Sequence, residues 1–203
     1  MSISEHDRER ISAAIRAAEE KTSGEIVCVV AETSSDAIGL SILLATIAAL
    51  AVPWVLMAST ALPVRSILVL QVMTFIVLAL VLCLPRIRVA LLPRRARRAV
   101  AHRVAVEQFS IRGIARKKDR SGILIFVSLA EHYARIIADV GIASKVPQAQ
   151  WQGAVDTLVA QCGQGRVADG FISAIEVCGG VLATHFPRTA ESRDELPDRI
   201  YVI

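Results

Sequence analysis

The residues that come closest to a hydrolytic pattern are Ser128, Glu131 and His132, which lie within one five-residue stretch. A hydroxyl beside a base is the arrangement of a nucleophile that is activated by proton transfer. Catalytic serines also need a group that orients the base and a sharp turn that exposes the hydroxyl, and the surrounding sequence supplies neither. We therefore predict a solvated turn here, and no catalytic residue.

Polar residues also follow two predicted buried strands of the chain. Glu32 and Thr33 come directly after the first strand, and Ser128 and Glu131 lie at the end of the second. A helix connects these strands, so we expect them to be parallel, and ligands of open α/β sheets bind outside the carboxyl ends of parallel strands. The four residues form a candidate ligand crevice. Because the first strand leads directly into an apolar segment, we expect this crevice near a bilayer surface.

No metal or cofactor site is predicted. The cysteines form no CxxC pair and no cluster with histidine, and no two histidines have the i, i+4 spacing of a zinc site. No Gly-Lys-Ser/Thr sequence occurs, which argues against a nucleotide-binding loop. We expect the four cysteines to be small buried hydrophobic residues: Cys28, Cys83, Cys162 and Cys178.

The composition indicates an integral membrane protein. Hydrophobic residues make up 54% of the chain, and the only charged residue from position 37 to position 85 is Arg65. Two apolar spans, residues 38–62 and 67–84, are each long enough to cross a hydrocarbon core of about 30 Å. The alternative is a buried helical hairpin in a globular core, but two adjacent runs this apolar argue against it. We predict a transmembrane helical hairpin with its turn at residues 62–66.

A cluster of arginines follows the second span, in a chain whose net charge is +4. Beside an apolar span, such a cluster indicates anionic lipid headgroups rather than nucleic acid, or serves only to set the topology. The loop between the spans carries one cation, so the positive-inside rule places both termini in the cytoplasm. We predict a multi-pass protein of the cell's inner (plasma) membrane. The arginines predicted at the lipid surface are Arg86, Arg88, Arg94, Arg95, Arg97 and Arg98.

Hydrophobic periodicity predicts the elements of the soluble part. Apolar residues on one face indicate helices, and short β-branched runs indicate strands. The second and third strands are separated by a short turn, so we expect them to pair antiparallel. The chain ends in a segment that can pair as an edge strand. The predicted helices are 4–21, 94–109, 148–162 and 168–184, and the predicted strands are 25–31, 122–128, 133–139 and 199–203.

The membrane hairpin interrupts one soluble domain. The first part of this α/β domain is residues 1–36, and the hairpin is residues 37–85. The remainder of the domain is residues 86–187, and residues 188–203 form a C-terminal tail. Since both ends of a two-span hairpin emerge on the same side of the membrane, the two soluble parts can fold together.

The order and spacing of four segments resemble the TPM domain family. The resemblance covers about residues 4–36 and 94–187, and it implies an α/β/α sandwich with a small mixed sheet. In this chain the sandwich is interrupted by the two-helix transmembrane hairpin. The segments are Thr22-Ser-Gly-Glu-Ile-Val27, Arg120-Ser-Gly-Ile-Leu-Ile-Phe-Val-Ser128, Tyr133-Ala-Arg-Ile-Ile-Ala-Asp-Val-Gly-Ile142, and the stretch from Trp151 through Gly170-Phe-Ile-Ser-Ala-Ile175 to His185-Phe-Pro187.

The resemblance also carries an expectation about activity. Family members credited with acid-phosphatase activity or calcium binding have acidic residues after the third strand and at the start of the next helix. The corresponding residues 143–150 of this chain include no acid and one lysine. Hard cations bind mainly through carboxylates, so the sequence predicts no metal site there.

Three classes of function are compatible with the sequence. The favoured class is a non-catalytic interaction or scaffold module that the hairpin anchors in the lipid bilayer. The alternative is a divalent-metal-dependent, phosphatase-like hydrolase. A transporter or channel subunit is disfavoured because the spans contain no ionisable residue along a conduction path. Another membrane protein is a candidate partner, and so is a second copy of the chain, joined through hairpin residues that include Gly39, Ala45, Thr46, Gln71 and Thr74.

Overall fold

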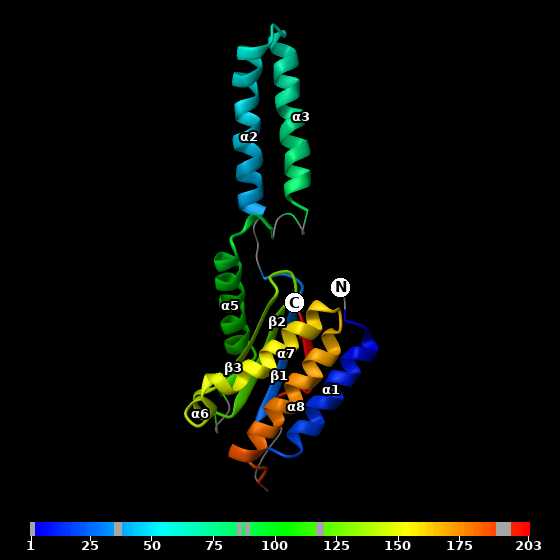
Figure 1. Ribbon diagram of the computed structural model, residues 1–203, viewed down its shortest axis with the longest axis vertical. Helices are drawn as coiled ribbons and strands as arrows, with labels where there is room; N and C mark the ends of the chain where they lie inside the picture. The colour runs from blue at the N-terminus through cyan, green and yellow to red at the C-terminus, as the bar shows by residue number, and fades with distance from the viewer. Residues whose placement is uncertain (1–2, 35–37, 85–86, 88–89, 117–119, 190–195) are drawn as a thin grey trace. The chain divides into compact units, whose positions relative to one another are not determined.

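The computed structural model describes residues 3–34, 38–84, 87, 90–116, 120–189 and 196–203. The chain divides into two compact units (Figure 1). One unit comprises Met1–Ser34 and Arg98–Ile203, and the other comprises Ser35–Arg97. The first unit is thus assembled from two parts of the chain, with the second unit inserted between them.

A four-stranded mixed sheet, in the order β3-β2-β1-β4, forms the centre of the first unit. β1 (Glu25–Ala31) lies parallel to β2 (Gly122–Ser128) and to the edge strand β4 (Ile200–Val202). β2 pairs antiparallel with β3 (Tyr133–Ala138). Every residue of β1 and β2 is buried, as expected of strands that are covered on both faces. The mixed sheet and its strand directions are therefore as predicted.

Helices cover both faces of the sheet (Figure 1). Three helices pack on one face, where Ile11, Ile125 and Phe171 belong to the larger hydrophobic core: α1 (Glu5–Glu19), α7 (Gln152–Gly163) and α8 (Val167–His185). The other face is covered by α5 (Arg94–Ile111), whose Ala105 packs in a smaller core with Val29 and Phe126. This layering is the predicted α/β/α arrangement.

Three short elements adjust the predicted boundaries. Helix α5 continues beyond the predicted end at residue 109 to Ile111, and the chain then forms η1 (Ile114–Arg116). The helix expected over residues 148–162 is divided into η2 (Gln148–Trp151) and α7, because Pro147 starts a tight first turn. The third short element, α6 (Val140–Ala143), begins at the N-cap Asp139.

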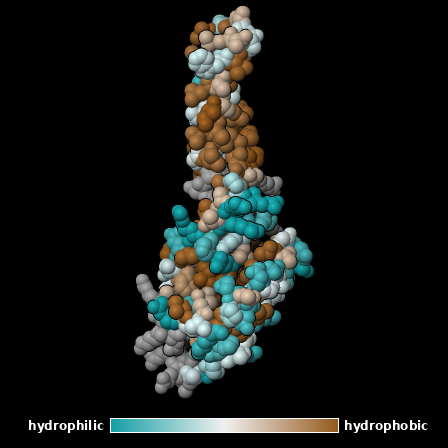
Figure 2. Space-filling model, turned by 60° about the vertical axis from the view of Figure 1, so that its left-hand side comes forward, coloured by the Kyte–Doolittle hydropathy of each residue, from teal (hydrophilic) through white to brown (hydrophobic). Residues whose placement is uncertain are grey.

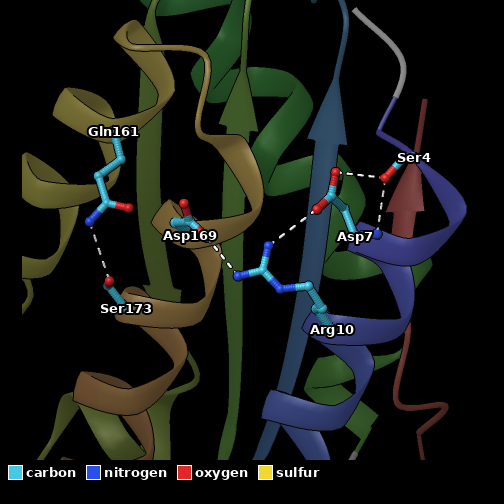
Figure 3. A network of polar contacts seen from close by, with 6 residues as sticks. All are labelled: Ser4, Asp7, Arg10, Gln161, Asp169 and Ser173. Atoms are coloured by element: carbon cyan, nitrogen blue, oxygen red, sulfur yellow. Dashed lines mark hydrogen bonds and ion pairs between the residues drawn. The ribbon is translucent and has the colours of Figure 1, made fainter.

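Helix α1 is connected to α8 by a polar network (Figure 3). The Ser4 hydroxyl caps α1 by accepting from the backbone N–H of Asp7 at 3.1 Å. Arg10 bridges the Asp7 carboxylate at 3.3 Å and the Asp169 carboxylate at 2.7 Å. The hydrogen bond from Ser4 and the charge of Arg10 lower the pKa of Asp7. All these groups are exposed, so the network contributes to orientation more than to stability.

Close packing in this layer depends on a small residue. A Cβ added at Gly179 of α8 would lie 2.8 Å from the Cβ of Ala18 in α1, closer than side-chain carbons approach one another. Glycine at this position therefore allows the two helices to touch. Helix α8 is long and apolar enough to be a third candidate membrane span beside α2 and α3, but eight of its residues are buried within the first unit. We treat α8 as a core helix.

The second unit is a hairpin of two long apolar helices, α2 (Ile38–Ser59) and α3 (Val64–Leu82). Small residues of α2 face α3: Ser41, Ala45 and Ala49 are buried, and the Ser41 hydroxyl donates to the carbonyl of Leu82 at 2.9 Å. Ala45 is therefore used within the hairpin, whereas a Cβ added at Gly39 would meet no atom within 4 Å. Apolar side chains cover the outside of both helices (Figure 2).

The hairpin turn differs from the prediction. The spans were expected over residues 38–62 and 67–84, but α2 ends at Ser59 and α3 already begins at Val64. Pro63 explains the early start, because its carbonyl accepts from the N–H groups of Ser66 and Ile67 and its missing donor costs nothing before a helix. Arg65 consequently lies in the first turn of α3 rather than in a loop.

The cysteines of the first unit are poorly ionised thiols. Cys28 and Cys178 are buried, as predicted, and Cys162 is half-buried. Burial raises the pKa of Cys28 well above its usual range. Burial also raises the pKa of Cys162 to about 11. Cys83, at the end of α3, is half-buried as well. Two of the four cysteines are therefore buried as predicted, and the other two are only half-buried.

Candidate functional site

The carboxyl ends of β1 and β2 meet in a cluster of hydrogen-bonded polar side chains, which we call the Glu131 cluster: Thr33, Ser34, Ser128 and Glu131. One carboxylate oxygen of Glu131 accepts from the Thr33 hydroxyl at 3.1 Å. The other accepts from the backbone N–H of Ser34 at 3.0 Å and from the Ser128 hydroxyl. The Ser34 and Ser128 hydroxyls are 2.7 Å apart. The Glu131 carboxylate thus joins the chain after β1 to the turn after β2.

The local sequence explains this geometry. Parallel pairing puts Ala31 beside Ser128, so both strands end at the same level. The chain then continues the ladder, because Leu129 and Ala130 donate backbone hydrogen bonds to Ala31 and Glu32 at 3.0 and 3.1 Å. The turn into β3 closes at His132, whose φ of 48° lies in the left-handed region. This turn directs Glu131 back to the end of β1.

The structure brings three of the four predicted crevice residues together. Thr33, Ser128 and Glu131 are in contact, whereas Glu32 is exposed and its backbone N–H donates to the carbonyl of Ile203 at 3.1 Å. Ser34 completes the cluster, and only its place after the first strand could have indicated it. The crevice remains a prediction.

Accessibility limits what the Glu131 cluster can do chemically. Ser128 has no exposed surface and Glu131 is 6% exposed, so neither side chain is open to a substrate from solvent. His132 is exposed, and among the described residues its ring makes no hydrogen bond with Ser128 or Glu131. A buried carboxylate that accepts several hydrogen bonds is a structural connection rather than a poised general base.

A second buried carboxylate lies at the opposite end of the sheet. Asp139 caps α6 by accepting from the backbone N–H of Val140 at 2.7 Å, and Arg120 approaches the same oxygen at 3.6 Å. The other Asp139 oxygen is buried without a hydrogen-bond partner among the described residues. Within the described ranges, no three His, Cys, Asp or Glu residues group closely enough to hold a metal ion.

Four of the six arginines predicted at the lipid surface are among the described residues, and they lie at the start of α5. Arg94, Arg95 and Arg98 are exposed, and Arg97 is half-buried. They fall within the first five residues of the helix and therefore point in several directions around its axis. Arg86 and Arg88 lie outside the described residues.

Comparison with known proteins identifies the class to which this fold belongs. Residues 85–181 match the TPM domain, so the chain contains a TPM domain, as the order of its segments predicted.

A solved structure and a search of curated proteins complete the comparison. The fold is similar to the NMR structure of the BA42 protein from the psychrophilic bacterium Bizionia argentinensis, with a TM-score of 0.62 and 20% sequence identity. The alignment covers 100% of this chain and 96% of that chain. At this level of identity the similarity shows the fold alone. No curated protein sequence matches significantly.

Proposed function

We propose that this chain is an integral membrane protein that holds its TPM domain at the cytoplasmic surface of the plasma membrane. The domain is a non-catalytic interaction module for lipid headgroups or for another membrane protein. The observation that carries the proposal is the pair of long apolar helices, α2 and α3, which stand between β1 and α5 in the sequence of the domain.

The surface of the hairpin supports a lipid environment. Large apolar side chains face outward along both helices (Figure 2). Trp54 of α2 is 79% exposed and Leu80 of α3 is 68% exposed. In water, so large a contiguous apolar surface would be unfavourable by about 25 cal/mol for each Å². The hydroxyls of Thr46 and Thr74 are satisfied inside their own helices, because they donate to the carbonyls of Ile42 and Leu70. Such internal pairing is what a hydrocarbon environment requires.

The distribution of arginines supports the orientation. Arg65 is the one cation near the hairpin turn, while four described arginines, Arg94 to Arg98, stand at the start of α5. A bias of this size favours a cytoplasmic location for the α5 side of the hairpin. Each arginine near anionic lipid contributes about 1 kcal/mol, so four contribute about 4 kcal/mol at most.

The Glu131 cluster supports a non-catalytic role. Its serine and its carboxylate are buried and hydrogen-bonded to each other, and they connect the two parts of the domain that the hairpin separates in the sequence. The cluster holds the chain after β1 against the turn after β2, at the point where the chain continues towards α2. Self-association remains an additional candidate role of the hairpin, through Gly39 and the outward faces of its helices.

A phosphatase assay tests the absence of catalysis. We expect full-length protein in detergent to hydrolyse p-nitrophenyl phosphate no faster than protein-free buffer, with magnesium, calcium or manganese present. Saturable turnover that needs a divalent cation and is lost in Ser128→Ala would instead establish the hydrolase. Circular dichroism of the variant serves as the control for folding.

A further inference from the structure

We propose that Arg112, Arg199 and Tyr201 form a binding site for a phosphate-type oxyanion. These residues come from distant parts of the chain: Arg112 follows the last residue of α5, and Arg199 and Tyr201 belong to the segment of β4. The site goes beyond the proposed anchoring role and does not depend on it.

Two guanidinium groups contact one tyrosine ring. The guanidinium carbon of Arg112 lies 3.7 Å from the centroid of the Tyr201 ring, and that of Arg199 lies 4.8 Å from it. Tyr201 pairs with Val29 across the β1–β4 ladder, which directs its ring to the face of the sheet that α5 covers. The register of β4 therefore brings both cations together on this face.

Arg112 is oriented by its own helix. Its Nε–H donates to the side-chain oxygen of Gln108 at 3.2 Å, and its backbone N–H donates to the carbonyl of the same residue at 3.0 Å. Among the described residues only Nε of the guanidinium is used, which leaves its terminal N–H groups available for a ligand. Contact with the tyrosine ring further restricts the group. The arginine is held in place before any ligand arrives.

The two cations have no anionic partner among the described residues. The ion pairs found elsewhere in the domain join Arg8 and Arg10 to acids of α1 and α8, and Arg120 to Asp139. The acid nearest to the site in sequence is Asp198, and it forms no ion pair with Arg112 or Arg199. Its buried Oδ1 accepts no hydrogen bond from the described part of the chain. Two neighbouring positive charges repel each other, and a bound anion would remove that repulsion.

The chemistry of the three side chains matches a tetrahedral oxyanion. Guanidinium groups bind phosphate oxygens through paired N–H donors, and two of them can contact different oxygens of one group. The Tyr201 hydroxyl is a further donor. A phosphomonoester or free phosphate carries nearly two negative charges at neutral pH, which suits two cations.

Calorimetric titration of inorganic phosphate into full-length protein in phosphatidylcholine nanodiscs, at low ionic strength, tests the site. We expect saturable binding that weakens at least tenfold in Arg112→Gln and in Arg199→Gln. Arg16→Gln, which changes an exposed arginine of α1, should bind as the wild type does. Gln108→Leu leaves both cations in place and should weaken binding by less than either arginine variant.

A second arm distinguishes the source of the phosphate group. If a phosphomonoester lipid is the ligand, phosphatidic acid in the nanodisc will compete with inorganic phosphate, and the competition will disappear in Arg112→Gln. If free phosphate is the ligand, phosphatidic acid will not compete. The proposal is overturned if wild-type protein binds phosphate in neither lipid, or if both glutamine variants bind it as tightly as the wild type.

Discussion

Glu131→Ala is expected to lower the free energy of unfolding of the TPM domain by about 3 kcal/mol. The substitution removes an acceptor that serves Thr33, Ser34 and Ser128. It leaves the half-buried Ser34 N–H without its partner and the buried Ser128 hydroxyl with only the Ser34 hydroxyl. A buried donor that loses its partner costs about 1–3 kcal/mol, and bonds to a charged acceptor lie at the upper end. The effect should exceed that of any exposed acid.

Urea unfolding of the full-length protein in detergent measures this effect. Trp151 is buried in the domain and Trp54 is exposed on the hairpin, so a Trp54→Phe background leaves Trp151 as the only fluorescent tryptophan. Glu9→Ala, on the exposed surface of α1, is the control and should change stability by less than about 0.5 kcal/mol. Glu131→Gln should fall between them, because an amide keeps one acceptor. A Glu131→Ala effect as small as that of the control would show that the Glu131 cluster does not stabilise the domain.

Ile47→Arg combined with Leu50→Arg is expected to prevent stable insertion of the hairpin. Both side chains lie in the middle of α2 and are more than half exposed on its outer surface. An arginine at the centre of a membrane helix costs about 2.5–3.5 kcal/mol, so two cost about 5–7 kcal/mol. This exceeds the roughly 3–6 kcal/mol that the ten Leu, Ile and Val residues of α2 provide on the same scale.

Alkaline carbonate extraction of membranes provides the measurement. The double variant should move from the membrane pellet to the soluble or aggregated fraction. The matched control is Ser59→Arg with Thr60→Arg, which places the same charges at the end of α2, where long side chains reach the interface. Equal retention of the two double variants in the membrane would show that α2 does not span it.

The sequence predicts the sheet and the hairpin well for identifiable reasons. β1 and β2 are runs of β-branched residues that are buried on both faces, and the lengths of the connections determine which strands are parallel. The apolar spans of the hairpin are visible from composition alone. The turn was misplaced because a proline can start a helix as well as end one, and Pro63 precedes the first turn of α3.

The candidate sites are less predictable because they depend on side-chain direction and strand register. The parallel pairing predicted for β1 and β2 places Thr33, Ser128 and Glu131 close together, as the structure has them. The burial of Glu131, however, follows from the left-handed conformation of His132, which the sequence does not reveal. The arginine pair at Tyr201 requires the register that places Tyr201 beside Val29. An edge strand of three residues carries too little pattern to predict that register.

The most direct test of the membrane-anchored account is thiol labelling of intact and then permeabilised cells. In a Cys83→Ala background, single cysteines replace Ala61 in the hairpin turn or Ala160 on the exposed surface of α7. The native Cys28 and Cys162 should react slowly, because their raised pKa values leave little thiolate at neutral pH. We predict that Ala61→Cys is labelled from outside and that Ala160→Cys is labelled only after permeabilisation. Labelling of Ala160→Cys in intact cells would contradict the account and place the TPM domain on the outer side of the membrane.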